Sequence, residues 1–125
     1  MDRVTVAKGS DLKGADTTGG ISRRTAIDEP ELWAGISRIP AAVATGWHHH
    51  GTNTTVFYMM AGTLTVEHGA NESAVATAGD FVVVPAGVEH REIIGSGVDA
   101  EAIVMRFGDG TGPLVIDVDR GEGDA

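Results

Sequence analysis

Short runs of apolar, often β-branched residues recur along the chain and are separated by glycine and proline. Almost no stretch keeps the apolar spacing of three and four residues that marks an amphipathic helix, so the chain is expected to be mostly β. A tight bend or a hairpin is expected at Gly62, because one apolar run ends just before it and the next begins directly after it. Many short strands with turn signals between them indicate a sandwich or a barrel. The predicted strands cover residues 32–39, 56–60, 63–67, 81–84, 100–107 and 114–118.

The chain has 125 residues, which is the length of one domain, and no internal repeat or linker divides it. We expect an N-terminal arm with a short edge strand over residues 1–19, a barrel over residues 20–119 and a flexible tail over residues 120–125. The apolar edge at residues 4–6 would need to be covered, because an exposed strand edge invites further pairing.

The charge of the chain excludes two classes of partner. Eighteen acidic and nine basic side chains give a net charge of −9, which would repel nucleic acids and anionic membrane surfaces. The absence of cysteine excludes disulfides, thiolate metal ligands and cysteine nucleophiles. The first residues lack the apolar core of a secretory signal, and no apolar run approaches the length of a membrane helix, so we expect a soluble, cytoplasmic protein.

Histidines supply the chemistry that the sequence suggests. In an extended segment His48 and His50 point to one face while His49 points away, and His90 could join the first two from a second strand. Neutral imidazole is a common ligand of divalent metals, and three such rings leave coordination positions open for water or substrate. We therefore predict a metal site at His48, His50 and His90. His49 is expected to be structural, and His68, next to a glycine, to be a turn residue.

Both histidine motifs resemble those of the cupin superfamily, G-x5-H-x-H-x(3,4)-E-x6-G and G-x5-P-x-G-x2-H-x3-N. The matching positions are His48, His50 and Gly62 in the first motif and Gly79, Pro85, Gly87 and His90 in the second, with Ile94 where asparagine is usual. The resemblance covers about residues 20–119, with further similar segments at 20–24, 32–35 and 112–115. It implies an all-β fold, the double-stranded β-helix or jelly-roll barrel of a small single-domain bacterial cupin, and a homodimer built from strands near the N-terminal arm.

One departure from the family pattern changes the expected chemistry. Thr55 stands where the acidic metal ligand of the family should be, and residues 52–54 offer no carboxylate either. Three neutral ligands leave the full charge on the metal, which should strengthen its attraction for anionic or enolate-like ligands. Similarity to three-histidine cupins implies Fe(II) as the preferred ion, with zinc, manganese, nickel and copper as alternatives.

Residues around the histidines complete the predicted site. Glu92 shares the face of His90 on a regular strand, which makes it a candidate substitute carboxylate or catalytic base, or else a solvated strand end. An apolar pocket lining is predicted from strand alternation, although the same residues would form any barrel core. The predicted lining consists of Thr55, Phe57, Met59, Phe81, Val83 and Ile94, whereas Tyr58 should project the other way.

Two arginines, Arg38 and Arg106, lie inside apolar strands, where a cation needs a partner. Either could anchor a substrate carboxylate, but salt bridges to the many acidic residues are favoured. The glycine-rich segment 108–112 is interpreted as a turn, because no lysine follows it and no helix begins there.

Three functional hypotheses remain open at this stage. The preferred one is a metal-dependent enzyme that oxygenates a small organic molecule with ferrous iron, because a three-histidine site leaves cis positions for both substrate and dioxygen. The second is a redox-neutral isomerase, cyclase or lyase that uses the metal as a Lewis acid, with Glu92 or water as base. The third is a non-catalytic binding or sensing module whose metal site has degenerated.

Overall fold

The computed structural model of the chain describes residues 3–16, 20–109 and 115–120. These residues form two antiparallel sheets, and the only regular helical element among them is one short 3₁₀ turn, Gly9–Asp11. The strands are β1 (Lys13–Asp16), β2 (Ser22–Glu29), β3 (Leu32–Ile39), β4 (His48–His49), β5 (Thr54–Ala61), β6 (Thr63–His68), β7 (Glu72–Thr77), β8 (Phe81–Val84), β9 (His90–Ile94), β10 (Ala100–Phe107) and β11 (Ile116–Asp117). The chain is therefore all-β, as its pattern of short apolar runs predicts.

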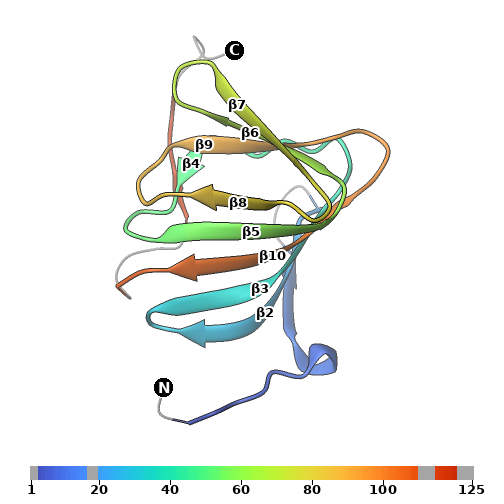
Figure 1. The fold of residues 1–125 in the computed structure, drawn as a ribbon, viewed down its shortest axis with the longest axis vertical. Helices are drawn as coiled ribbons and strands as arrows, with labels where there is room; N and C mark the ends of the chain where they lie inside the picture. Colours follow the sequence, from blue (N-terminus) through green and yellow to red (C-terminus); the bar gives the residue numbers. More distant parts are fainter. Residues whose placement is uncertain (1–2, 17–19, 110–114, 121–125) are drawn as a thin grey trace.

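Figure 1 shows the two sheets as the two sides of a barrel-like sandwich, with one sheet in the order β1-β2-β3-β10-β5-β8 and the other in the order β11-β4-β9-β6-β7. Apolar side chains of both sheets meet between them, because alternate residues of each strand point inward. The buried apolar core consists of Trp33, Phe57, Met59, Leu64, Val66, Ala76, Val84, Ile94, Ala100, Ala102 and Val104.

Gly62 forms a tight bend that carries the chain from one sheet to the other, rather than a hairpin within one sheet. It has φ +82°, and β5 before it and β6 after it belong to different sheets. A Cβ atom at this position would lie 2.7 Å from the Cα of Ala100, so only glycine fits both the backbone angle and the space.

The N-terminal edge strand is β1, which pairs with β2, whereas residues 4–6 are not in a strand. Val4 and Val6 are 94% and 74% exposed, so the structure leaves this apolar segment uncovered. Within the described part of the chain, no helix has the length and apolar character needed to cross a membrane.

Two residues of β8 that were predicted to line the pocket lie on its outer face instead. Phe81 and Val83, predicted to line the pocket, are 67% and 61% exposed. Residues Val82 and Val84 take the inward positions, since Val82 is the register partner of inward-facing Phe57. The prediction was wrong because all four residues of β8 are apolar, so the sequence carries no alternation that would distinguish the two faces.

Candidate metal centre

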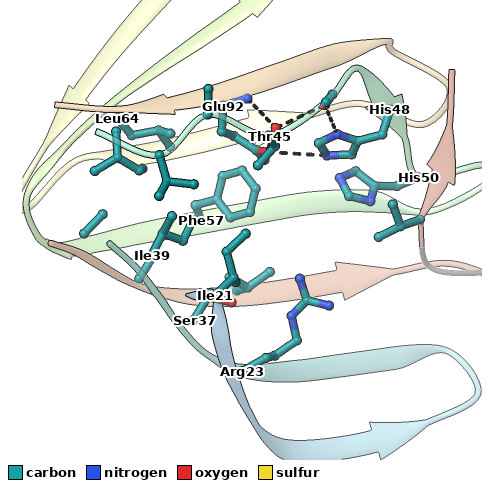
Figure 2. A pocket seen from close by; sticks show the side chains of 18 of the residues that line it. Ile21, Arg23, Ser37, Ile39, Thr45, His48, His50, Phe57, Leu64 and Glu92 are labelled. Atoms are coloured by element: carbon teal, nitrogen blue, oxygen red, sulfur yellow. Dashed lines mark hydrogen bonds and ion pairs between the residues drawn. The ribbon is translucent and has the colours of Figure 1, made fainter. Parts of the chain in front are cut away.

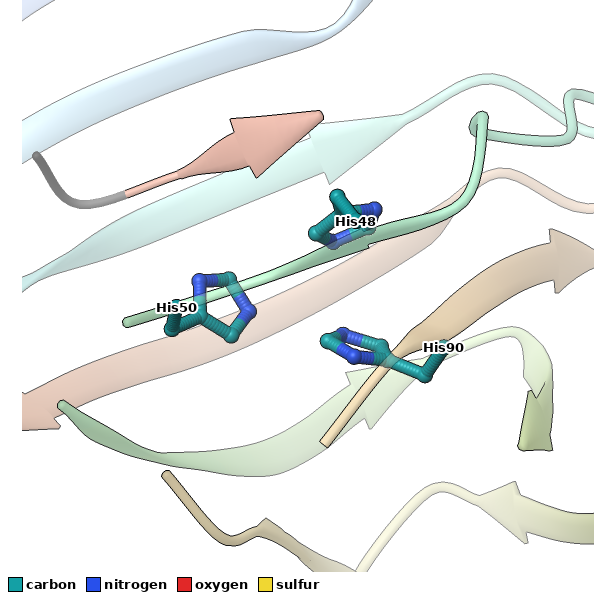
Figure 3. A group of neighbouring side chains, drawn as sticks. All are labelled: His48, His50 and His90. Atoms are coloured by element: carbon teal, nitrogen blue, oxygen red, sulfur yellow. The ribbon is translucent and has the colours of Figure 1, made fainter. Parts of the chain in front are cut away.

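The three predicted histidines converge in the structure, and together they are called the three-histidine centre below. His48 and His90 are register partners where β4 pairs with β9, and His50 follows two residues after His48 and so shares its face. Figure 3 shows the three rings pointing toward a common space. All three side chains are buried, and their possible ligand atoms lie within 4.8 Å of one another, close enough to hold one metal ion.

Backbone carbonyl groups orient two of the rings. Nδ1 of His48 lies 2.8 Å from the carbonyl oxygen of Gly46, and Nδ1 of His90 lies 2.9 Å from that of Val88. Because a carbonyl oxygen can only accept, each Nδ1 carries the proton, and the lone pair of each ring is on Nε2. This is the arrangement in which protein histidines bind metals through Nε2 while the second nitrogen is held by an acceptor.

The buried Nε2 atom of His90 shows whether a metal fits the three-histidine centre. Within the described residues it makes no hydrogen bond, although burial of an unsatisfied polar atom is unfavourable. A divalent cation among the three rings would bind this lone pair, and imidazole suits iron, zinc, copper and nickel. The donor set of the three-histidine centre therefore fits the divalent metal that the sequence predicts.

Glu92 lies directly beside two of the rings. Its Oε1 is 3.5 Å from Nε2 of His90, and its Oε2 is 3.5 Å from Nε2 of His48. The Thr45 hydroxyl donates to Oε2 at 3.1 Å and accepts from the Glu92 backbone N–H at 2.9 Å, which fixes the carboxylate in place (Figure 2). Glu92 is thus not a solvated strand end but a buried group at the edge of the three-histidine centre.

The surroundings of Glu92 keep it charged. Burial raises the pKa of this carboxyl, but the His90 and His48 rings and the Thr45 hydroxyl together outweigh burial, so the pKa lies below its ordinary value. Burial lowers the pKa of His90, and the nearby Glu92 carboxylate more than offsets it, so the net shift is upward. An ionised carboxylate beside three imidazoles supplies the negative charge that the Thr55 position lacks.

Two histidines of the three-histidine centre, His48 and His50, line a cavity of about 500 Å³, a size typical of small-molecule sites, whereas His90 is fully buried and is not a lining residue. Figure 2 shows side chains from both sheets around this cavity. Its lining includes His48, His50, Glu92, Phe57, Met59, Leu64, Ile94, Val104, Ser37, Arg23 and Arg106. The structure thus brings Phe57, Met59 and Ile94 to the cavity, as the strand alternation predicts.

Thr55, also predicted to line the pocket, is not among the lining residues and is fully buried. It alternates with Val56 and shares the inward face of β5 with Phe57 and Met59. Tyr58 faces outward and packs on Phe81 with ring centroids 4.7 Å apart.

The remaining histidines lie outside the centre. The Nδ1 atom of His49 accepts a hydrogen bond from the Gly51 backbone N–H at 3.0 Å, a structural role. His68 ends β6 and lies 3.6 Å from the carboxylate of Glu72, across the turn to β7.

The two arginines singled out in the sequence behave differently. Arg38 forms the expected ion pair, 3.2 Å from Asp99. Arg106 is only 3% exposed, lines the cavity and forms no ion pair with any described residue, so the salt bridge favoured for it is absent from that part of the chain. Sequence reasoning also missed Arg23 as a lining residue, because β2 is too polar to be read as a barrel strand.

Comparison with known proteins places these features in a family. A model of the cupin domain matches residues 35–106, which is more than half of the chain. The uncharacterized protein YdbB of Bacillus subtilis (strain 168) is 38% identical over 53 residues, which are 40% of this chain and 47% of that protein, so the match spans about half of its length.

Solved structures with the same fold include, by title, a cyclase and a predicted decarboxylase. The polyketide cyclase RemF from Streptomyces resistomycificus superposes with a TM-score of 0.73 at 20% identity, covering 98% of this chain and 88% of that one. A predicted oxalate decarboxylase from Thermotoga maritima superposes with a TM-score of 0.74 at 14% identity, covering 83% and 99%. These similarities concern the fold, and together with the family match and the three-histidine centre they identify the chain as a member of the cupin domain family.

Proposed function

We propose that this cupin binds one divalent metal ion through His48, His50 and His90 and is a metal-dependent enzyme acting on a small organic molecule. The observation that carries the proposal is the convergence of three buried imidazoles, two of which, His48 and His50, line a cavity of about 500 Å³. A site built only to stabilise the fold would be closed on all sides, whereas this one opens onto space for a ligand.

Different residues of the chain would have different roles in such a site. The metal would stabilise negative charge that develops on an oxygen atom of the substrate, and this effect is worth several kcal/mol in enzymes. Phe57, Met59 and Ile94 contribute apolar walls that exclude water and so strengthen electrostatic interactions inside. Glu92, held by Thr45, is positioned either to contact the metal or to accept a proton from the substrate.

Oxygenation with ferrous iron is the preferred reaction. Three neutral ligands leave positions for both a substrate and dioxygen, and an apolar cavity admits dioxygen readily. No carboxylate occupies the Thr55 position to fill one of these places. Consumption of dioxygen by the iron-loaded protein with a substrate, and its loss under anaerobic conditions, would support this reaction.

A redox-neutral reaction, such as an isomerisation, cyclisation or elimination, is the second candidate. The specific observation in its favour is the Glu92 carboxylate, ionised and 3.5 Å from two of the rings, where a general base is needed. Turnover that persists without dioxygen, with zinc or manganese in the site, would support this candidate and exclude the first.

The first experiment is elemental analysis of untagged protein purified without chelator. About one equivalent of a transition metal supports the proposal, because a chain with three convergent histidines should retain its ion. Less than about one tenth of an equivalent, with no thermal stabilisation when Fe(II), Zn(II) or Mn(II) is added, would contradict it and favour a non-catalytic binding module.

A further inference from the structure

Two arginines on separate strands share one aromatic platform in the cavity. Arg23 on β2 and Arg106 on β10 both line the cavity that holds the three-histidine centre. Their guanidinium carbons lie 5.8 Å and 4.9 Å from the centroid of the Trp33 ring on β3. Figure 2 shows the Arg23 guanidinium pointing into the cavity, on the same side as His50.

The strand order explains why these groups meet. β3 lies between β2 and β10, and Arg106 is the register partner of Trp33. A Cβ atom on Gly35 would lie 2.7 Å from Cη2 of Trp33, so the indole extends over this glycine and covers the inner face of β3. A cation above an indole face is stabilised by the ring quadrupole, which lets two cations approach the same platform.

The guanidinium groups retain unused donors. Among the described residues, Nε of Arg23 and both Nε and Nη1 of Arg106 are buried without a hydrogen-bond partner. Such atoms are rare in folded proteins, and a buried cation without a counter-ion is unfavourable. The arrangement is therefore explained if an anion in the cavity supplies the missing counter-charge to the two guanidinium groups.

The charges in the cavity indicate the sign of that ligand. Burial and the positive charge of Arg23 lower the pKa of Arg106 to about 10, against a smaller opposing effect of Glu92. Both guanidiniums are still cationic at neutral pH. Two carboxylates line the cavity, Glu92 and the exposed Asp117. Only Glu92 affects the pKa of both arginines, and Thr45 and the histidine rings hold its carboxylate. A proposed metal ion would add to the positive charge, so the cavity favours an anion.

We infer that Arg23 and Arg106 bind the carboxylate of a small organic acid whose apolar body extends along the cavity toward the three-histidine centre. A planar carboxylate matches the fork of a guanidinium and accepts two parallel hydrogen bonds. A carboxylate is preferred to a phosphate because the rest of the wall is largely apolar and offers few further donors to a dianion. The role of the acid as substrate rests on the proposed function; the binding of the acid does not.

The experiment uses defined probes, because the natural acid is unidentified. Benzoate and 3-methylbutanoate are titrated calorimetrically into the full-length protein, each beside its neutral amide, with inorganic phosphate as a third anion. At least one carboxylate should bind at least about tenfold more tightly than its amide, since a charge-assisted hydrogen bond contributes that much or more. Phosphate should bind more weakly than that carboxylate.

Arg106→Met and Arg23→Met should each weaken binding of the carboxylate about 10- to 100-fold, with little effect on binding of the amide. Arg24→Met is the matched control, because Arg24 is the exposed neighbour of Arg23 on the same strand, and this variant should bind like the wild type. Both cavity variants should unfold at the same temperature as the wild type or higher, because methionine replaces the unpaired charge of buried Arg106 or half-buried Arg23 with an apolar chain of similar length. If the arginine had a purely structural role, its replacement by methionine would instead lower the unfolding temperature.

Arg106→Lys and Arg23→Lys provide further variants should a methionine variant fail to fold. Lysine keeps the charge but loses the fork, so it should restore only part of the affinity. The inference is overturned if neither carboxylate binds the wild type more tightly than its amide, if phosphate binds more tightly than both, or if Arg24→Met weakens binding as much as the cavity variants do.

Metal content measured on the same samples separates the two proposals. Carboxylate binding that depends on Arg23 and Arg106 in protein that retains no metal supports the inference and contradicts the proposed enzyme. Retention of one metal equivalent without preference for carboxylates supports the proposed enzyme and contradicts the inference. Titrations of both zinc-loaded and metal-free protein make these outcomes distinguishable.

Discussion

His48 and His90 face each other as register partners of β4 and β9, with ring centroids 4.3 Å apart. The backbone pairing of two strands thus sets the distance between these rings, and carbonyl groups of Gly46 and Val88 set their orientation. A site whose ligands are held by the sheet in this way is preorganised, so a metal should bind it without ordering a loop. This relationship leads to the first prediction.

Removal of the metal should lower the unfolding temperature without unfolding the protein. The ion binds only the native state, so free metal at about one hundred times its dissociation constant adds about 2.7 kcal/mol to the free energy of unfolding. Circular dichroism and thermal melts before and after dialysis against a chelator measure the effect. Loss of the β-sheet spectrum on chelation at room temperature would show that the sheet does not hold the site by itself.

Replacement of any one histidine of the three-histidine centre by alanine should abolish stable metal binding. His90→Ala is expected to reduce the bound metal from about one equivalent to less than about one tenth, because two neutral ligands hold a divalent ion weakly. His49→Ala is the control, since its ring bonds to the Gly51 backbone and lies outside the centre. Equal metal loss in both variants would mean that His49 is needed for metal binding as much as His90, which would contradict the assignment of the ligands.

Glu92→Gln should weaken metal binding about 10- to 100-fold while keeping the fold, because glutamine retains the size of the side chain but not its charge. The Thr45 hydroxyl can still donate to the amide oxygen, which keeps the side chain in place. Competition with a chelator of known affinity measures the change. Glu89→Gln, at an exposed position next to His90, is the control and should leave the affinity unchanged.

Gly35→Ala should destabilise the protein by about 1–3 kcal/mol, the usual effect of overpacking a core. The added Cβ would clash with the backbone carbonyl of Arg24 and lie 2.7 Å from Cη2 of Trp33. Urea unfolding measures the change in free energy. Gly14→Ala, whose Cβ would have an ordinary contact of 3.8 Å with Cγ of Arg24, should change stability far less. An unchanged midpoint for Gly35→Ala would show that Trp33 does not need this glycine.

Asp99 should stabilise the fold in a pH-dependent way. Its carboxylate accepts from the Ala41 backbone N–H at 2.9 Å and from Arg38 at 3.2 Å, and these contacts lower the pKa below its ordinary value of 3.8. A group whose pKa is lower in the folded state stabilises fully above the unfolded pKa, and this stability is lost as pH falls through the folded pKa. Wild type should therefore exceed Asp99→Asn in unfolding temperature at about pH 7; the difference should begin to shrink as pH falls to about 3.8 and should vanish only below the folded pKa. A difference that stays constant over this range would contradict the assignment.

Much of the fold follows from local features of the sequence. The run from Leu32 to Ile39 is β3 in full, because it is a mostly apolar segment bounded by Pro30 and Pro40, which limit how far a strand can extend. β2 and β7 were missed because their residues are mostly polar or exposed, and only the pairing of their backbones with β3 and β6 makes them strands. The sequence also left undetermined which residues of β8 face inward, since four consecutive apolar residues fit either face.

Some features of the candidate site likewise follow from the sequence, and others depend on the tertiary structure. The sequence alone determined that His48 and His50 share one face, because alternation along an extended segment is a local property. The resemblance of both motifs to those of cupins then implied that His90 would join them from a second strand, and the pairing of β4 with β9 brings it there. Only the tertiary structure decided that Glu92 lies against two of these rings, that Arg106 faces the cavity without an ion pair to any described residue, and that Arg23 joins it over Trp33. These relationships depend on the order and register of strands far apart in the chain. Backbone hydrogen bonds between those strands set that order, and no short segment of sequence records it.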